Sequence, residues 1–330
     1  MQVRLDKRAR IIDEGGQAYP VDLLRDHTLK QIREKYTDEA GELTLEVGEE
    51  VPDDVVTIGG RVMFLRNTGK LCFTSLQDGF TESSNGERLQ VMLSKALVGE
   101  QALAAWKSDV DLGDFVWVKG FVARSRRGEL SVMATEWKMA SKALRPLPTL
   151  HKELGEETRV RRRYADLVAR EEARQMVRVR AAITRAIRTT LDELGFLEIE
   201  TPILQLVHGG AAARPFNTHL NAFDIGMSLR IALELYLKRA MVGGMDRVYE
   251  MGRVFRNEGI DSNHSAEFTM LEAYMSWGNQ FTIAEVIQQI IVRAADALGG
   301  RQIQTEQGVI DLDGQWEWVH VHPELSRRLG

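Results

Sequence analysis

Ionisable residues between Val248 and Tyr274 have the types and spacing best suited to chemistry in this 330-residue chain. Arg256, Glu258 and Glu272 stand in or beside segments rich in β-branched, aromatic and methionine residues, which predict strands. A carboxylate inside such a strand is costly to bury unless a cation meets it, and that cation comes from the protein or from a ligand. We therefore expect either a binding site for a charged ligand or a structural ion pair between Arg256 and Glu272.

Two predicted strands, Val248–Arg256 and Phe268–Tyr274, must position these side chains. Successive residues of a strand point to opposite faces, so alternate residues of the second strand, Glu272 among them, share one face. The polar loop Gly259–Glu267 is longer than the roughly two to five residues of an ordinary hairpin connection. Its length predicts a contact with a ligand or with another element.

The pattern FRNEG…H…EFTMLEAY in this stretch resembles motif 2 of the class II aminoacyl-tRNA synthetases, and in particular that of the bacterial-type lysyl-tRNA synthetases. The resemblance implies that Arg256 is the catalytic residue that clamps the α-phosphate of ATP and the amino-acid carboxylate. It also implies that Glu258 accepts a hydrogen bond from the adenine amino group, that Phe268 stacks on the adenine, and that His264 lies near the phosphates.

Segments before motif 2 also resemble this family. HGGAAARPF and RIALELYLKRA are similar to the family segments HGGA-ARPF and RIAPELYLKRL. The resemblance implies that Gly210 lies against the bound lysine, that Glu234 or Glu272 provides a countercharge for its ε-ammonium, and that Tyr274 adds a hydroxyl acceptor. Taken without the resemblance, Glu234 also fits an exposed helical pair with Lys238, worth only about 0.3–0.5 kcal/mol.

Three positions depart from the family pattern: Leu233 replaces a proline, Asn263 replaces a basic residue, and Ser265-Ala266 replaces Asn-Pro. The family's third motif, a glycine-rich strand and helix with an arginine, is not found, nor are the acidic Mg²⁺ ligands before it. We therefore expect a chain truncated before motif 3, whose family uses ATP and Mg²⁺ but which holds no metal site itself. Whether it is active, and whether the truncation is biological, stay open.

Residues Thr57–Trp137 read as five short strands, with one helix, Lys95–Lys107, after the third. This is the plan of an OB-fold, a barrel that binds oligonucleotides on its face and in its loops. Arg66, Phe73 and Gln90 could form one surface with a cation, a stacking ring and an amide, although Phe73 alone also fits a core position.

Two segments of this region, GRVMFLRNTGKLCFTSLQD and GELSV, resemble the anticodon-binding domain of lysyl-tRNA synthetases. The resemblance implies that Arg66, Phe73, Gln90 and Glu129 contact anticodon bases.

Composition limits the alternatives. The net charge of −5 argues against a generally basic nucleic-acid coat. The single cysteine, Cys72, excludes an internal disulfide framework and a cysteine-based zinc site. No apolar run approaches the about 20 residues needed to span a bilayer, and the charged N-terminus has no apolar secretory segment. We expect a cytoplasmic location without membrane contact.

A long helix, Glu171–Leu194, is predicted to end at Gly195 and to lead into the strand FLEIETPIL. Helix, glycine, strand and proline together resemble motif 1 of class II synthetases, which implies a homodimer formed through this segment. The clearest helix of the chain is Phe281–Leu298, for which Thr282 and Glu285 predict a capping box.

We thus expect an α+β protein with an N-terminal OB-fold β-barrel followed by a partial class II antiparallel-sheet catalytic domain. The expected domains are a helical appendage (1–54), the OB-fold anticodon-binding domain (55–150) and the partial catalytic domain with motifs 1 and 2 (151–330), the last two joined by a linker, Ala143–Glu157. The expected function is lysine–tRNA ligation through lysyl-adenylate, with lysine, ATP and tRNA(Lys) as partners. The alternatives are a catalytically dead fragment that only binds tRNA or dimerises, and part of a fusion that also transfers lysine to membrane lipid.

Overall fold

The computed structural model describes residues 1–148, 154–261, 263–314 and 316–329. The chain divides into two compact units, Met1–Arg178 and Val179–Gly330, and each is described by itself. Part of the predicted linker, residues 149–153, lies outside the described residues. No helix within the described ranges is both long and apolar enough to cross a membrane.

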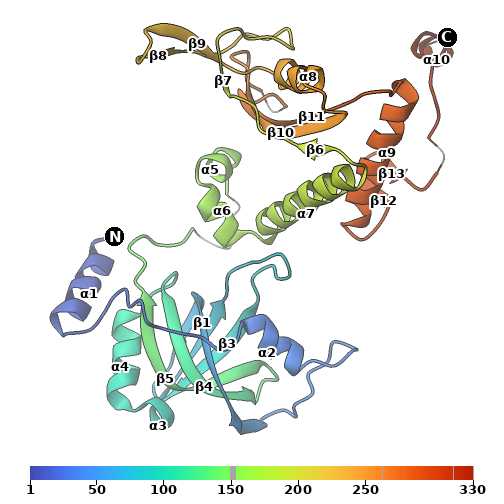
Figure 1. The fold of residues 1–330 in the computed structure, drawn as a ribbon. Helices are drawn as coiled ribbons and strands as arrows, with labels where there is room; N and C mark the ends of the chain where they lie inside the picture. The colour runs from blue at the N-terminus through green and yellow to red at the C-terminus, as the bar shows by residue number, and fades with distance from the viewer. Residues whose placement is uncertain (149–153, 262, 315, 330) are drawn as a thin grey trace. The chain divides into compact units, whose positions relative to one another are not determined.

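Five strands of the first unit close into a barrel in the order β1-β2-β3-β5-β4, as predicted for an OB-fold (Figure 1). Strands β3 and β5 pair in parallel, and the other neighbours are antiparallel. The strands are β1 (Glu50–Asn67), β2 (Leu71–Gln77), β3 (Arg88–Ser94), β4 (Phe115–Arg124) and β5 (Leu130–Ser141).

The barrel interior is filled by the apolar side chains that alternate along these strands. Trp106 packs into the same core, where it is fully buried. Its ring lies edge-on to that of Trp137, with 5.1 Å between the ring centroids. The prediction of one helix over residues 95–107 is wrong in its number of helices. The structure has two helices, α3 (Lys95–Val98) and α4 (Glu100–Asp109). The break comes at Gly99, whose φ of +85° is incompatible with a right-handed helix.

A buried cluster of charges attaches the N-terminal helix α1 (Gln2–Asp13) to the barrel. The ammonium of Lys142, with no exposed surface, lies 2.6 Å from carboxylate oxygens of both Asp111 and Asp114. Lys7 of α1 binds Asp111 from the other side at 2.8 Å. Burial alone would raise the pKa of Asp111, but hydrogen bonds from Lys142 and Lys7 lower it below its ordinary value.

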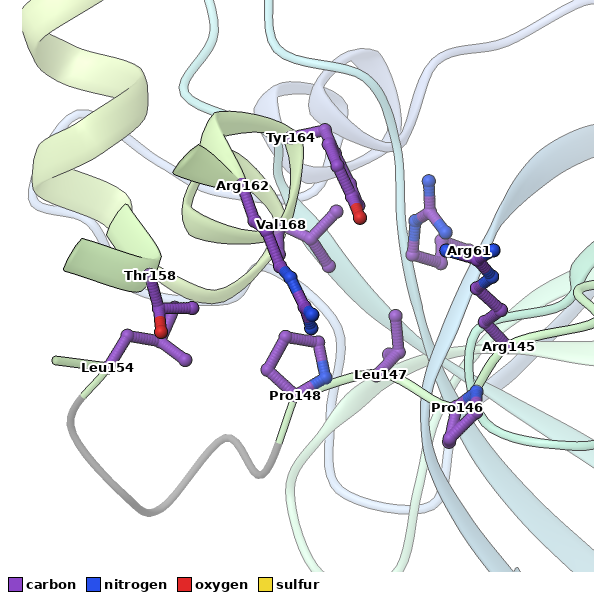
Figure 2. Close-up of a pocket in the computed structure, with 11 residues that line it drawn as sticks. Arg61, Arg145, Pro146, Leu147, Pro148, Leu154, Thr158, Arg162, Tyr164 and Val168 are labelled. Carbon is purple, nitrogen blue, oxygen red and sulfur yellow. The ribbon is translucent and has the colours of Figure 1, made fainter. Parts of the chain in front are cut away.

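Three short helices complete the first unit: α2 (Leu29–Lys35), α5 (Glu156–Arg161) and α6 (Arg163–Ala169). Helices α5 and α6 border a cavity of about 570 Å³. Figure 2 shows Arg162 and Tyr164 on one side of this cavity and Leu147 and Pro148 on the other. None of the predicted site residues lines it.

A three-stranded sheet in the order β11-β10-β6 organises the second unit. One face packs on α7 and α9 through Leu191, Tyr249 and Val286, and the other packs on α8 through Leu237 and Val254 (Figure 1). The elements are α7 (Glu171–Glu193, which begins in the first unit), β6 (Leu197–Glu198), α8 (Glu234–Val242), β10 (Arg247–Phe255), β11 (Glu267–Met275) and α9 (Gln280–Asp296).

The remaining elements correct two predictions. The strand predicted for FLEIETPIL is two short strands, β6 and β7, in different sheets, because Pro202 between them has no backbone N–H to donate. The capping box of α9 is formed by Asn279 and Thr282, not by Thr282 and Glu285. The other elements are β7 (Leu204–Gln205), β8 (Asn217–Leu220), β9 (Ile225–Leu229), β12 (Gln302–Thr305), β13 (Gly308–Asp311) and α10 (Val321–Leu329).

Candidate functional site

Arg256 follows directly after strand β10 and does not pair with Glu272, so the predicted structural ion pair between them is wrong. Its Nε donates to the carbonyl oxygen of Ile231 at 3.2 Å, and its guanidinium carbon lies 5.3 Å from the centroid of the Phe268 ring. Its two terminal nitrogens make no hydrogen bond within the described part of the chain. They are therefore available to an anionic ligand beside an aromatic ring.

A buried ion pair on this hairpin joins Glu250 of β10 to Arg230, and the sequence analysis missed it. The two charged groups lie 2.6 Å apart, with 3% and 5% of their side chains exposed. Arg230 also donates to the carbonyl oxygens of Arg253 and Thr201, and the Thr201 hydroxyl donates to Glu250. One signal was present in the sequence: a glycine within a strand, here Gly252, often marks a close approach, and the Arg230 guanidinium occupies the space of its missing Cβ.

Glu272 stands directly opposite Glu250 in the β10–β11 register, but it has no cationic partner among the described residues. One of its oxygens accepts the backbone N–H of Leu233 at 3.0 Å, and the other accepts the hydroxyl of Tyr274 at 2.9 Å. Burial and this bond to Glu272 raise the pKa of Tyr274, which keeps the phenol protonated and donating. Leu233, which replaces the family's proline, therefore gives Glu272 a hydrogen bond that a proline could not donate.

Glu234 begins α8 close to this carboxylate. Its Oε1 lies 2.6 Å from the ammonium of Lys238, so the predicted helical pair is present, and that ammonium lies 5.9 Å from the Tyr274 ring centroid. Gly210 approaches from the other side with a φ of +86°, and a Cβ there would lie 2.9 Å from Cβ of Glu234 and 3.1 Å from Cβ of Ala232. A larger residue would not fit without displacing Glu234.

The loop residues lie apart from these contacts. His264 is exposed and its Nδ1 lies 2.9 Å from a carboxylate oxygen of Asp261. The backbone N–H of Asn263 and the side chain of His264 lower the pKa of Asp261. Glu258 accepts the backbone N–H of Arg214 at 3.3 Å. The hydrogen bonds of His264 and Glu258 thus go to Asp261 and Arg214, not to Arg256.

A metal site made by the protein needs several donor side chains that converge. Within the described ranges, no three histidine, cysteine, aspartate or glutamate side chains converge as metal ligands. The described residues therefore offer no metal site built from protein side chains alone.

On the barrel, all four residues predicted to contact anticodon bases line one cavity of about 730 Å³: Arg66, Phe73, Gln90 and Glu129. Arg66 and Phe73 are opposite each other on β1 and β2, and the guanidinium carbon lies 4.4 Å from the ring centroid. The Gln90 amide nitrogen donates to the Ser131 hydroxyl at 2.8 Å. Phe73 is half-buried on the cavity wall, so the alternative that it is a core residue is wrong.

The charge of this cavity favours an anion. Its lining includes two glutamates, Glu50 and Glu129, and the arginines at positions 66, 124, 126 and 127. Arg124 is held by the carbonyl oxygens of Gly128 and Leu45, whereas Arg126 and Arg127 are exposed in the turn between β4 and β5. Cations around a stacking ring suit single-stranded nucleic acid.

Comparison with known proteins gives two family matches. Residues 56–140 match "OB-fold nucleic acid binding domain", and residues 155–327 match "tRNA synthetases class II (D, K and N)". The chain is similar to a lysine–tRNA ligase of Kineococcus radiotolerans, 55% identical over 332 residues, which cover 100% of this chain and 64% of that protein.

Two further relatives are similar along the whole chain. A lysine–tRNA ligase of Mycobacterium bovis BCG is 53% identical over 331 residues, which cover 100% of this chain and 63% of that protein. A lysylphosphatidylglycerol biosynthesis bifunctional protein of Rhodococcus jostii is 40% identical over 337 residues, which cover 100% of this chain and 28% of that protein. The chain thus spans less than two thirds of the length of the two ligases.

Proposed function

We propose that this chain, which belongs to the class II tRNA synthetases (D, K and N), acts in the ligation of lysine to tRNA. The proposed reaction activates lysine with ATP to lysyl-adenylate and then transfers the lysyl group to tRNA(Lys). The similarity to lysine–tRNA ligases supports this choice among the three amino acids of the family.

The observation that carries the proposal is the carboxylate of Glu272, half-buried and without a cationic partner among the described residues. A lysine ε-ammonium would provide the missing charge, with Glu234 as a second carboxylate and Tyr274 as a further acceptor. A neutral or acidic amino acid would leave Glu272 buried without a counterion, which costs binding energy. The site thus favours lysine over aspartate and asparagine.

For ATP, we assign Arg256 and Phe268 the main contacts. The free guanidinium nitrogens of Arg256 suit bidentate binding of the α-phosphate and the substrate carboxylate, and the neighbouring ring offers a stacking surface to adenine. Such groups act by position and by electrostatic stabilisation of the attacked phosphate. We also assign Glu258 a contact with adenine and His264 a place near the phosphates.

For tRNA, we assign anticodon binding to the barrel cavity with Arg66, Phe73, Gln90 and Glu129. We also propose a homodimer formed through α7 and β6, and domain boundaries at residues 54/55 and 150/151. These assignments rest on the resemblance of the sequence to motif 1 and to the anticodon-binding domain.

A second candidate is an RNA-binding module without catalysis. One contrast favours it: the closed barrel gathers all four of its predicted residues in one cavity, whereas His264 and Glu258 bind Asp261 and Arg214 and not Arg256.

Lysine-dependent ATP–pyrophosphate exchange by this chain, with tRNA(Lys) binding measured in parallel, separates the two candidates. Exchange above background that Glu272→Gln abolishes supports the ligase. No exchange, with tRNA binding that Phe73→Ala abolishes and Val55→Ala preserves, supports the RNA-binding module. Val55 is a matched control because it is an exposed apolar residue of β1 outside the cavity. The absence of both exchange and tRNA binding would refute both candidates.

A further inference from the structure

Strand β1 contains a bulge that no feature of the sequence analysis predicted. Val62 pairs with Leu76, whereas Phe64 pairs with Ser75, so Met63 is an extra residue on β1. A bulge of this kind shifts the inside–outside alternation of a strand by one residue. Val62 and Met63 are both buried as a result, and Phe64 follows with 52% of its surface exposed.

The shift places Phe64 on the same outer face as Arg66, and both line the cavity that holds Phe73. Without the bulge, Phe64 would point into the barrel interior. Its neighbour across the pair is Ser75, a small residue that pairs on its other side with Gln90. The ring of Phe64 is therefore left uncovered, in the same row of residues across the sheet as Gln90.

We propose that Phe64 is a second stacking platform, which binds an unpaired base next to the base that stacks on Phe73. This inference rests on the proposed anticodon-binding function and adds a residue to it. Phe73 lies on β2, two residues from Ser75, the residue directly opposite Phe64. The Cα atoms of such diagonal neighbours on adjacent strands lie about 7–8 Å apart. Adjacent nucleotides of an unstacked strand can bridge that spacing.

The surroundings support a nucleic acid as the occupant. Every base has a π-face, so an exposed ring binds bases with little dependence on sequence. Arg126 and Arg127 at the rim provide charge for the phosphates, and Gln90 and Glu129 provide groups that can read base edges. Phe64 then adds a stacking surface to the charged and polar side chains of the same cavity.

The test is binding of an RNA hairpin with the anticodon loop of tRNA(Lys) to this chain, followed by fluorescence anisotropy. We expect Phe64→Ala to weaken binding about tenfold, as stacking of one base predicts. Phe64→Trp should retain binding because it keeps a π-face, whereas Phe64→Leu, apolar but not aromatic, should weaken binding as Phe64→Ala does. The matched control Val55→Ala should bind like the unchanged chain.

Hairpins that lack one base at each loop position in turn identify the base involved. At the position that stacks on Phe64, the unchanged chain and Phe64→Ala should bind with equal affinity, and elsewhere the difference should persist. Binding of Phe64→Ala or Phe64→Leu within twofold of the unchanged chain would overturn the inference but leave anticodon binding intact. Failure of the unchanged chain to bind any of these hairpins would instead overturn the proposed tRNA binding, and the inference with it.

Discussion

Gly252 lies against the buried Arg230–Glu250 ion pair, so one added methyl group there tests whether that pair supports the site. In Gly252→Ala, the new Cβ would overlap Nη2 of Arg230 and lie 3.0 Å from Oε1 of Glu250. The guanidinium has little room to yield, because it also donates to the carbonyl oxygens of Thr201 and Arg253. We expect the ion pair to be displaced.

The expected loss of stability follows from the burial of that pair. Removing one partner of a buried ion pair costs about 3–5 kcal/mol. Both partners remain in Gly252→Ala but move apart, so we expect the lower end, about 3 kcal/mol. In a unit of this size each kcal/mol lowers Tm by about 2–4 °C, so the transition of the second unit should fall by about 6–12 °C.

Scanning calorimetry measures this shift, and hydrogen exchange of the β10 amides assigns it to the second unit. The matched control is Gly226→Ala in β9, where no heavy atom outside its immediate neighbours lies within 4 Å of the added Cβ. We expect that control to stay within about 1 °C of the unchanged chain or to rise slightly. If the two variants melt together, the close approach at Gly252 does not constrain the ion pair, and the reasoning is wrong.

Four further perturbations test single contacts. Lys142→Ala leaves Asp114 buried without its ammonium, and urea unfolding should show a loss of about 3 kcal/mol. Glu272→Gln keeps the shape of the site but removes its charge, and calorimetric titration should show lysine affinity falling about tenfold or more. Leu233→Pro deletes the N–H that Glu272 accepts, and the same titration should show a loss of about three- to tenfold. Because the folded-state pKa of Asp111 is depressed, its stabilisation is complete above the unfolded pKa of about 3.9 and is lost as pH falls through the folded value. As pH falls through this range, the Tm of Asp111→Asn should therefore fall less than the Tm of the unchanged chain.

Most of the fold could be predicted, because it rests on local patterns. Alternating apolar residues predict the barrel strands, and the long apolar stripe predicts α7 within one residue of its observed end. The errors occur where one residue interrupts a pattern: Gly99 divides a helix, and Pro202 divides a strand. Met63 is a harder case, because a bulge depends on the pairing of two strands and leaves no trace in the sequence of one.

The candidate site was predictable residue by residue but not as a set of contacts. Alternation correctly places Glu272 and Tyr274 on one face of β11, where they bind each other. The partner of Arg256 could not be predicted, because the carbonyl it binds belongs to Ile231 in a distant segment. Arg230 was missed for the same reason: its pairing with Glu250 depends on how two segments pack.

The β10–β11 register gives the proposed lysine selectivity a physical basis. Glu250 and Glu272 are directly opposite, and like charges in such positions destabilise a sheet. Arg230 neutralises Glu250, while the donors to Glu272 in the described part of the chain are both neutral, the Leu233 N–H and the Tyr274 hydroxyl. A bound ammonium would therefore give Glu272 the counterion that Arg230 gives Glu250. A ligand without positive charge would leave Glu272 without a counterion, so selectivity for lysine would follow from the strand pairing itself.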